Sequence, residues 1–400
     1  HCPFTCSPLF AARSAQQDGT PVLRMYEWER IRQVPFQVDI FLPDGSPTLY
    51  VHVRIRNPHE HSIPMYWWSN AAVPAAPHTR VVAPADSAYT FNYTHKRLDE
   101  VPIPVFDGKD ITYPSGIGHA GDFFFRVRPP NRPWIASLDK NGQGLVQLST
   151  PRLGGRKVFT WGAGKGGRQW QRFLSGTDRS YLEIQSGLAR TQMEYLPMPA
   201  KAEWRWLECY GPCEADPDTI HTPDWEKTVQ TVADTVKTLV PDQTLSHVYA
   251  DAAEHTDQPP LEIIQQGSGW GALEGIRRSY AGEQPFCGKS TPFDNASLTD
   301  KQAPWLELLK TGAFPDLSPD ALPESYMVHK EWRELLERFL SSPTCGGWAA
   351  WMHLGLMYDY AGQVDRARAA CDISLGKCPT ALVERNLGII AGRQGKKDEA

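Results

Sequence analysis

The sequence lacks a basic excess, a long apolar run and a dense set of cysteines. Its 41 Lys and Arg face 46 Asp and Glu, which gives a formal charge of −5 over 400 residues. Nucleic acids and anionic membranes are bound through a positive field, so we expect neither as a partner. No stretch approaches the ~20 consecutive apolar residues of a membrane-spanning helix.

Eight cysteines in 400 residues are too few for a disulfide scaffold. Cys2 with Cys6 and Cys209 with Cys213 have the C-x-x-x-C spacing of a zinc site. Cys209 falls in an expected strand, however, and no nearby His completes a known ligand pattern. We therefore expect free thiols in a reducing compartment, hence a cytoplasmic protein, with no metal and no cofactor.

Tryptophan is abundant instead, with 14 residues, and the stretch Tyr181–Tyr210 is the most informative part of the chain. Its three short runs of alternating polarity, separated by Gly and Pro, predict adjacent antiparallel strands. Successive side chains of a strand point to opposite faces. Trp204, Trp206, Glu208 and Tyr210 are therefore expected on one face.

These residue types suit a polyhydroxylated ligand, because aromatic rings stack on sugar C–H faces while carboxylates and amides hold hydroxyls. The candidate bases are Glu183, Glu194 and Glu208. The candidate acids are His119 and Asp122, which lie in or at the end of the Gly-rich loop Tyr113–Asp122. We choose them because functional residues concentrate on loops that a rigid sheet holds in place. The candidate ligand-binding residues are Trp67, Asn70, Trp161, Gln185, Arg190, Gln192, Trp204 and Trp206.

Each assignment has a plain structural alternative. The tryptophans suit a packing face against a second sheet, because large aromatics are usually core residues. Each acid could pair with an Arg of its own sheet, and His119 could be an ordinary exposed loop residue. The glycine-rich segment 157–170 lacks the Ser or Thr that completes a phosphate loop. We interpret it as a long β-connection with Trp161 and Trp170 as aromatic walls.

The chain divides into three expected parts. Residues 1–215 are strand-rich, residues 216–330 form a helical and irregular linker region, and residues 331–400 form helical repeats. The repeat signal is Trp351-x-x-Leu354-Gly355-x-x-Tyr358, followed by Ala367 and Pro379, which matches the tetratricopeptide period of ~34 residues. A second copy begins at Leu387-Gly388 and runs to Ala400, so we expect more repeats in the natural protein.

Several runs resemble a bacterial family known only as a domain of unknown function followed by tetratricopeptide repeats. They are V-L-R-M-Y-E-W-E-R, M-Y-W-W-S-N-A-A-V-P, Y-L-E-I-Q-S-G-L-A-R-T-Q and W-L-E-C-Y-G-P. The resemblance implies an α+β multidomain chain: an antiparallel β-supersandwich of the galactose-mutarotase type, followed by helical repeats. Family members usually have more chain before the position of His1, so we expect a fragment truncated within the supersandwich.

Three functions follow as hypotheses. The first is an enzyme of the epimerase or glycosidase type, because mutarotase-like enzymes resemble one another in using a His and a Glu for acid/base chemistry. The second is a non-catalytic glycan-recognition scaffold whose repeats recruit a protein partner. The third is a helical-repeat adaptor in which the β-domain is only a structural cap.

Overall fold

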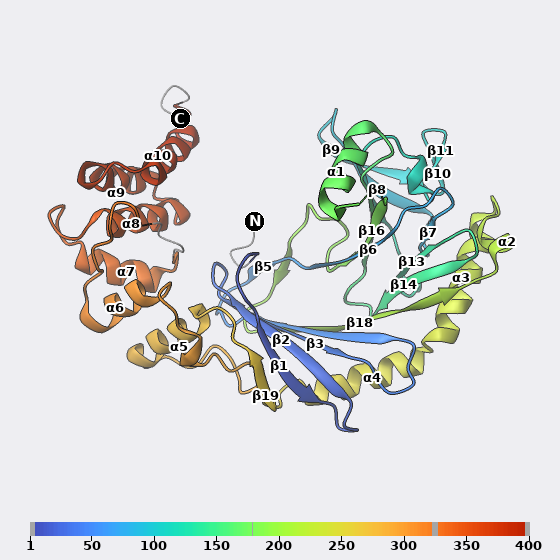
Figure 1. The fold of residues 1–400 in the computed structure, drawn as a ribbon, viewed down its shortest axis with the longest axis horizontal. Helices are drawn as coiled ribbons and strands as arrows, with labels where there is room; N and C mark the ends of the chain where they lie inside the picture. Colours follow the sequence, from blue (N-terminus) through green and yellow to red (C-terminus); the bar gives the residue numbers. More distant parts are fainter. Residues whose placement is uncertain (1–4, 178, 322–326, 397–400) are drawn as a thin grey trace. The chain divides into compact units, whose positions relative to one another are not determined.

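A computed structural model describes residues 5–177, 179–321 and 327–396 (Figure 1). The chain forms two compact units. The larger contains residues 12–25 and 36–263, and the smaller contains residues up to 11, residues 26–35 and residues from 264 onward. Within the described residues, no helix is both long enough and apolar enough to cross a membrane.

Two antiparallel sheets dominate the first 263 residues. The larger sheet has nine strands in the order β19-β1-β2-β3-β4-β18-β14-β13-β7. Their bounds are β1 Phe10–Ala15, β2 Pro21–Glu29, β3 Val34–Phe41, β4 Leu49–Arg56, β7 Arg80–Val82, β13 Trp134–Leu138, β14 Gln143–Ser149, β18 Glu203–Glu214 and β19 Glu262–Gln265. Strands β1, β2, β3 and β19 each contribute residues to both units.

The second sheet has six strands in the order β6-β16-β15-β12-β8-β9. Their bounds are β6 Trp68–Pro74, β8 Ser87–Asn92, β9 Arg97–Pro102, β12 Gly121–Phe125, β15 Gly155–Thr160 and β16 Tyr181–Gly187. Two short ribbons complete the β-structure: β10 Val105–Phe106 with β11 Lys109–Asp110, and β5 Ile63–Met65 with β17 Leu196–Met198.

The two sheets of the larger unit share a hydrophobic core. Val158 and Ile184 of the six-stranded sheet pack in one cluster with Val81 and Ile135 of the nine-stranded sheet. Side chains alternate along a strand. With Val158 and Ile184 on the buried face, the residues next to them in β15 and β16 therefore point to the opposite, outer face of the sheet. The sequence prediction of an antiparallel β-sandwich followed by helices is confirmed.

Helices α3 (Trp225–Leu239) and α4 (Asp242–His255) cover the nine-stranded sheet (Figure 1). The side chain of Asp224 caps α3 by accepting a hydrogen bond from the Lys227 amide at 3.0 Å. Val232 and Val236, one turn apart, are buried in a cluster with sheet residues such as Leu207. Together with the short α2 (Pro217–Ile220), these helices belong to the larger unit.

The glycine-rich segment after β15 forms a helix, α1 (Lys165–Ser175), so the prediction of a long β-connection is wrong beyond Thr160. Gly164 occupies the N-cap, and Gly176 ends the helix in the left-handed conformation with φ 64°. Between these two glycines, most residues are Lys, Arg, Gln, Trp, Phe or Leu, all of which helices accept. The high glycine content of this segment led to the wrong prediction, although two of its glycines mark the ends of the helix.

The smaller unit is mainly helical. Its elements are α5 Trp270–Ala281, η2 Asn295–Ser297, α6 Ala303–Thr311, α7 Lys330–Phe339, α8 Trp348–Tyr360, α9 Val364–Lys377 and α10 Ala381–Arg393. The indoles of Trp305 and Trp332 meet edge to face at 5.9 Å in its core. Trp332 also donates through Nε1 to the buried Glu274 carboxylate at 3.1 Å. Arg277 and Arg278 neutralise this carboxylate.

The helices α8, α9 and α10 occupy the positions that the tetratricopeptide spacing predicts. Gly355 of α8 lies against α9, because a β-carbon there would approach Cys371 Sγ to 2.6 Å. Ala367 of α9 is fully buried, so small residues at these two motif positions allow the helices to pack closely. Of the second repeat, Leu387 and Gly388 lie in α10, whereas its matching residues Asp398 and Ala400 lie outside the described residues.

Candidate functional site

The outer face of the six-stranded sheet carries a row of polar side chains. In the strand register, Asn70 of β6 is opposite Gln185 of β16, which is opposite Lys157 of β15. Glu183 lies two residues from Gln185 and therefore shares its face. We call the following six residues the polar array: Asn70, Asp122, Lys157, Glu183, Gln185 and Gln192.

Four hydrogen bonds and one ion pair join the polar array into one continuous chain. Asn70 Nδ2 and Gln185 Nε2 both donate to Glu183 Oε2, at 2.7 and 2.8 Å. Gln192 Nε2 donates to Gln185 Oε1 at 2.7 Å, and Lys157 Nζ donates to Gln192 Oε1 at 2.6 Å. The same ammonium pairs with Asp122 Oδ1 at 2.6 Å. Each member is therefore held in place by at least one other.

The array has a buried floor and an accessible edge. The side chains of Lys157 and Asp122 are 4% and 19% exposed, Glu183 is half-buried, and Asn70 is exposed. The Lys157 ammonium also lies 5.3 Å from the centroid of the Phe124 ring, a favourable cation–π distance. A buried cation needs such partners to offset its lost hydration.

Aromatic rings border the array. Trp161 meets Phe159 edge to face at 4.8 Å and Tyr181 at 6.1 Å. On the other side, the indole of Trp68 lies over Gly187, where a β-carbon would come within 2.2 Å of the ring. Trp68 can lie flat on the sheet only because Gly187 has no side chain.

Two carboxylates of the array share a cross-strand row. Asp122 of β12 and Glu183 of β16 are both paired with Phe159 of the intervening strand β15. Two strand spacings separate their backbones by roughly 10 Å. In inverting glycosidases the two carboxyl groups are roughly 6.5–9.5 Å apart, a distance of the same order as this backbone separation.

His119 lies at one end of this face. It follows the short helix η1 (Pro114–Gly116) and is exposed. Its backbone contacts the end of β15 closely, since a β-carbon on Gly162 would lie 2.4 Å from the His119 carbonyl carbon. The structure therefore places His119 near Trp161, at the same end of the sheet.

The loop after β16 brings Arg190 and Glu194 beside the array as an ion pair of their own. Glu194 also accepts the Thr191 amide at 3.1 Å, which stabilises the loop. The Arg190 guanidinium lies 5.9 Å from the ring centroid of Tyr89, on β8. This pairing is the salt-bridge alternative that the sequence left open for Glu194.

Glu208 and Trp206 are separated from the array, because they face the interior between the two sheets. They are 1% and 0% exposed. Glu208 accepts hydrogen bonds from Ser69 Oγ at 2.6 Å, Trp206 Nε1 at 3.0 Å and the Tyr210 hydroxyl at 2.8 Å. Burial and the neighbouring Glu208 carboxylate raise the pKa of Tyr210. The shared face of β18 was expected from the sequence, but here it forms part of the sandwich interior.

Two other tryptophans expected to bind a ligand, Trp67 and Trp204, lie away from the array. Trp67 packs against Trp206 at 5.3 Å and Phe36 at 6.4 Å, so it belongs with the interior group. Trp204 is half-buried beneath the Arg152 guanidinium, 5.1 Å from its ring centroid. Neither is a member of the aromatic border.

Sequence reasoning missed Lys157 and Trp68. Lys157 sits in a strand whose partners cannot be known without the fold, so its role as the cation of the array had no local signal. Of the adjacent Trp67 and Trp68, the sequence singled out Trp67 as a ligand-binding residue, whereas Trp67 packs against Trp206 and Trp68 lies over Gly187 on the outer face. The glycines at 155 and 187 were the available clue, since they mark strand positions over which a ring can lie.

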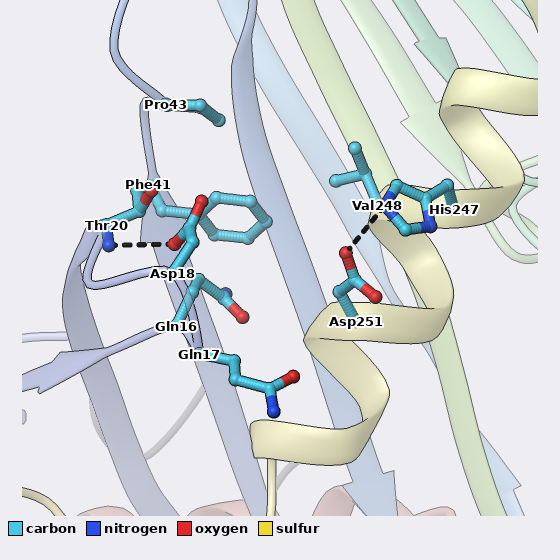
Figure 2. Close-up of a pocket in the computed structure, with 9 residues that line it drawn as sticks. All are labelled: Gln16, Gln17, Asp18, Thr20, Phe41, Pro43, His247, Val248 and Asp251. Atoms are coloured by element: carbon cyan, nitrogen blue, oxygen red, sulfur yellow. Dashed lines mark hydrogen bonds and ion pairs between the residues drawn. The ribbon is translucent and has the colours of Figure 1, made fainter.

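A separate cavity of about 470 Å³ lies between the β1–β2 turn and α4 (Figure 2). In it, His247 Nε2 pairs with Asp251 Oδ2 at 3.2 Å, and the Thr20 amide donates to Asp18 at 2.9 Å, which lowers the pKa of that carboxyl. It contains none of the residues expected from the sequence. Its lining residues are Gln16, Gln17, Asp18, Thr20, Phe41, Pro43, His247, Val248 and Asp251.

The cysteines offer no support for a shared metal centre. Cys209 and Cys213 are buried in β18, where burial raises the pKa of each thiol. Cys2 lies outside the described residues. The described residues contain no cluster of three or more His, Cys, Asp or Glu with metal-binding geometry.

Comparison with known families places the chain. Residues 1–201 match the family described as "Domain of unknown function (DUF5107)". The chain belongs to this family. The match covers the array strands β6, β8, β9, β12, β15 and β16 completely, so the polar array lies within the DUF5107 region.

One solved structure shares the fold. A TPR-domain containing protein from Parabacteroides distasonis ATCC 8503 is 17% identical, with a TM-score of 0.56, over 98% of this chain and 65% of that chain. The DUF5107 chain thus shares the fold of a protein longer than itself. A galactose mutarotase-like protein from Clostridium acetobutylicum is 8% identical, with a TM-score of 0.38, over 51% of this chain and 66% of that chain.

Proposed function

We propose that the polar array binds a carbohydrate. The observation that supports this most strongly is the Glu183 carboxylate, fixed by Asn70 and Gln185 at the accessible edge of a sheet and bordered by aromatic rings. Carboxylate and amide groups in fixed positions suit a row of hydroxyls, while rings such as Trp161 and Tyr181 suit the apolar faces of a sugar ring.

The array favours binding over acid/base catalysis. Glu183 already accepts two hydrogen bonds, and Asp122 is paired with the Lys157 ammonium. Both carboxylates are thus arranged as acceptors, whereas a general acid must hold a proton to donate. The separation of roughly 10 Å between the backbones of Asp122 and Glu183 keeps hydrolysis or epimerisation as a second candidate function.

A glycan array with the purified protein, followed by calorimetry on the best ligand, tests the proposal. We expect Glu183→Gln to weaken binding about tenfold or more, because hydrogen bonds to a charged acceptor contribute about 1.5–3 kcal/mol. Glu226→Gln, on the exposed surface of α3, is the matched control and should bind as the parent does. Failure to bind any glycan, or equal affinity in Glu183→Gln, would refute the proposal.

The second candidate is tested on the same variants. Anomer interconversion followed by NMR, and release of an aryl leaving group, would report turnover. If the protein turns over a sugar and the rate falls in both Glu183→Gln and Asp122→Asn, the array is catalytic. The same rate in both variants would remove these two carboxylates from any mechanism.

We infer separately that the helical repeats bind a protein partner. A cavity of about 550 Å³ is lined by residues of α8, α9 and α10 together with Val328. It combines exposed apolar side chains, Tyr360 and Ile389, with Arg385, while Arg393 pairs with Asp359 at 2.5 Å across the same lining. Arg385→Glu should abolish capture of a partner by the full chain without changing glycan binding. Unchanged capture would exclude this cavity as the contact.

A further inference from the structure

Helix α1 is inserted between β15 and β16, two strands that contribute to the polar array. At the start of β16, the Tyr181 amide donates to Gln171 Oε1 of the helix at 3.0 Å. Gly167 lies against the end of β15, because a β-carbon there would clash with the Trp161 carbonyl oxygen. The covalent connections and these two contacts fix the helix beside the array.

A run of aromatic rings leads from the array to this helix. Phe159 starts the run, because it is the cross-strand partner of the array residue Glu183. Its ring meets Trp161 edge to face at 4.8 Å. The indole of Trp161 is nearly parallel to that of Trp170, with centroids 6.5 Å apart and an interplanar angle of 23°. Trp170 meets Phe173 edge to face at 5.9 Å, so each of the four rings neighbours the next.

The far end of this run is open to solvent. Trp170 and Phe173 are 56% and 74% exposed, and Leu174 is 51% exposed. Residues three and four apart share one face of a helix, so these three side chains form a single apolar surface on α1. Contiguous exposed apolar surface marks a binding site, whereas scattered apolar residues do not. Trp161 joins this surface to the array, so a ligand that fills the array can continue onto it.

The apolar surface of α1 carries no charge. The basic residues of the helix, Lys165, Arg168 and Arg172, lie two or five residues from Trp170. At 3.6 residues per turn, this spacing places them on the opposite side of the helix, about half a turn away. The helix contains no acidic residue. A ligand that lies along the rings therefore meets uncharged groups.

We propose that the ligand of the polar array is an uncharged oligosaccharide and that the rings of helix α1 form a second subsite for it. This inference rests on the proposed function. One sugar unit occupies the array beside Glu183, and the following units extend across Trp161 to Trp170 and Phe173. Aromatic rings offer large apolar faces, which suit the C–H faces of successive sugar units. The second subsite adds affinity for longer chains without selecting a charge.

A helix with Trp, Phe and Leu on one side and basic residues on the other also suits a membrane surface. The oligosaccharide is favoured because Trp170 lies beside Trp161, a ring that also contacts Phe159 and Tyr181 of the sheet. A helix that only enters a lipid interface has no need of this connection to fixed hydrogen-bonding groups. The formal charge of −5 also opposes binding to an anionic membrane.

The test is calorimetry of the full chain with cello-, manno-, xylo- and malto-oligosaccharides of increasing length, with NMR titration for the weakest ligands. In the series that binds, we expect the tetrasaccharide to bind about tenfold more tightly than the monosaccharide, because it gains the ring contacts of α1. This gain should not depend on salt, since no charge contributes to it.

Two variants and a control assign the gain to α1. Trp170→Ala should remove most of the gain and leave the affinity for the monosaccharide unchanged. Phe173→Ala, which does not touch the Trp161 contact, should reduce the gain about threefold. Tyr280→Ala is the matched control, because Tyr280 is also a ring on a helix, 64% exposed, but belongs to α5 in the smaller unit. It should bind every chain as the parent does.

The outcomes separate this inference from the proposed function. Equal affinity for monosaccharide and tetrasaccharide, with Glu183→Gln still weakening both, would overturn the second subsite and leave the sugar site standing. Equal weakening of both ligands by Trp170→Ala would also overturn it. Binding of acidic glycans alone, or of none, would overturn the uncharged ligand, and binding of none would overturn the proposed function as well. Co-sedimentation with phosphatidylserine vesicles, lost in Trp170→Ala, would assign α1 to a membrane surface and overturn the inference.

Discussion

The Glu183 carboxylate of β16 accepts a hydrogen bond from the Asn70 side chain of the neighbouring strand β6 at 2.7 Å. Because Asn70 is exposed and Glu183 is half-buried, the bond orients the carboxylate at the accessible edge of the array. Asn70→Ala should therefore reduce glycan affinity about threefold to tenfold with little loss of stability, since an exposed hydrogen bond contributes about 0.5–1.5 kcal/mol. Calorimetry and thermal unfolding on the same sample separate the two effects.

The matched control for Asn70→Ala is Asn92→Ala. Asn92 also donates from one strand of this sheet to an acid of the next, Asp99, at 2.8 Å. It lies on β8, away from Glu183 in the strand order. Equal losses of affinity in the two variants would show that the effect of Asn70 is general and not tied to Glu183.

Lys157 and Asp122 form the ion pair of the array, at 2.6 Å. Lys157→Met should destabilise the larger unit by about 2 kcal/mol, because it leaves the Asp122 carboxylate without its cation. Lys157→Met combined with Asp122→Asn should recover part of that loss, which urea unfolding would measure as a coupling energy. Strict additivity would mean that the pair contributes nothing as a pair.

The contact of Trp68 with Gly187 gives a steric prediction. Gly187→Ala should destabilise the protein by about 2 kcal/mol, since its β-carbon would lie 2.2 Å from the indole and force it off the sheet. Gly166→Ala is the control. A β-carbon at Gly166 meets nothing within 4 Å, and this residue is in helix α1, so the change should stabilise by about 0.5–1 kcal/mol. Thermal unfolding of both variants decides whether the Trp68 platform depends on Gly187.

The sequence predicted the strands and the helical repeats, because each has a local signal, and the family resemblance supplied the sandwich. Alternation of polarity marks strands, and the spacing of Leu354, Gly355 and Tyr358 marks a repeat. It could not predict which face of a strand meets solvent. Glu183 and Glu208 lie in equivalent patterns, yet the first is on the outer face and the second is sealed between the sheets. That difference depends on which sheet each strand joins, a long-range property absent from local periodicity.

Buried histidine makes the larger unit sensitive to acid. Burial lowers the pKa of His52 to about 4, from 6.5. The imidazole of His52 therefore binds a proton more readily in the unfolded chain than in the folded one. The stability contributed by neutral His52 is present above pH 6.5 and is lost as pH falls towards 4. Over that window the loss is on the order of 3 kcal/mol. His52→Phe should flatten the pH dependence of urea unfolding between pH 6.5 and 4; an unchanged slope would contradict the assignment.

Glu27 gives the smaller unit the opposite pH dependence. It accepts the backbone amides of Trp28 and Ser268 at 2.8 Å each, but burial raises its pKa to about 7, from 4.5. The folded state therefore holds this proton more tightly than the unfolded state. Its contribution to stability is complete below pH 4.5 and is lost as pH rises through 7.

Glu27→Gln tests this directly, because the amide cannot ionise and keeps one acceptor oxygen. At acid pH we expect the variant to have a lower free energy of unfolding than the parent. This difference in the free energy of unfolding should narrow by an amount on the order of 3 kcal/mol as pH rises from 4.5 to 7. Hydrogen exchange of α5 amides, corrected for the intrinsic effect of pH, reports the smaller unit specifically. A gap that stays constant across this window would show that Glu27 is ionised in the folded protein throughout.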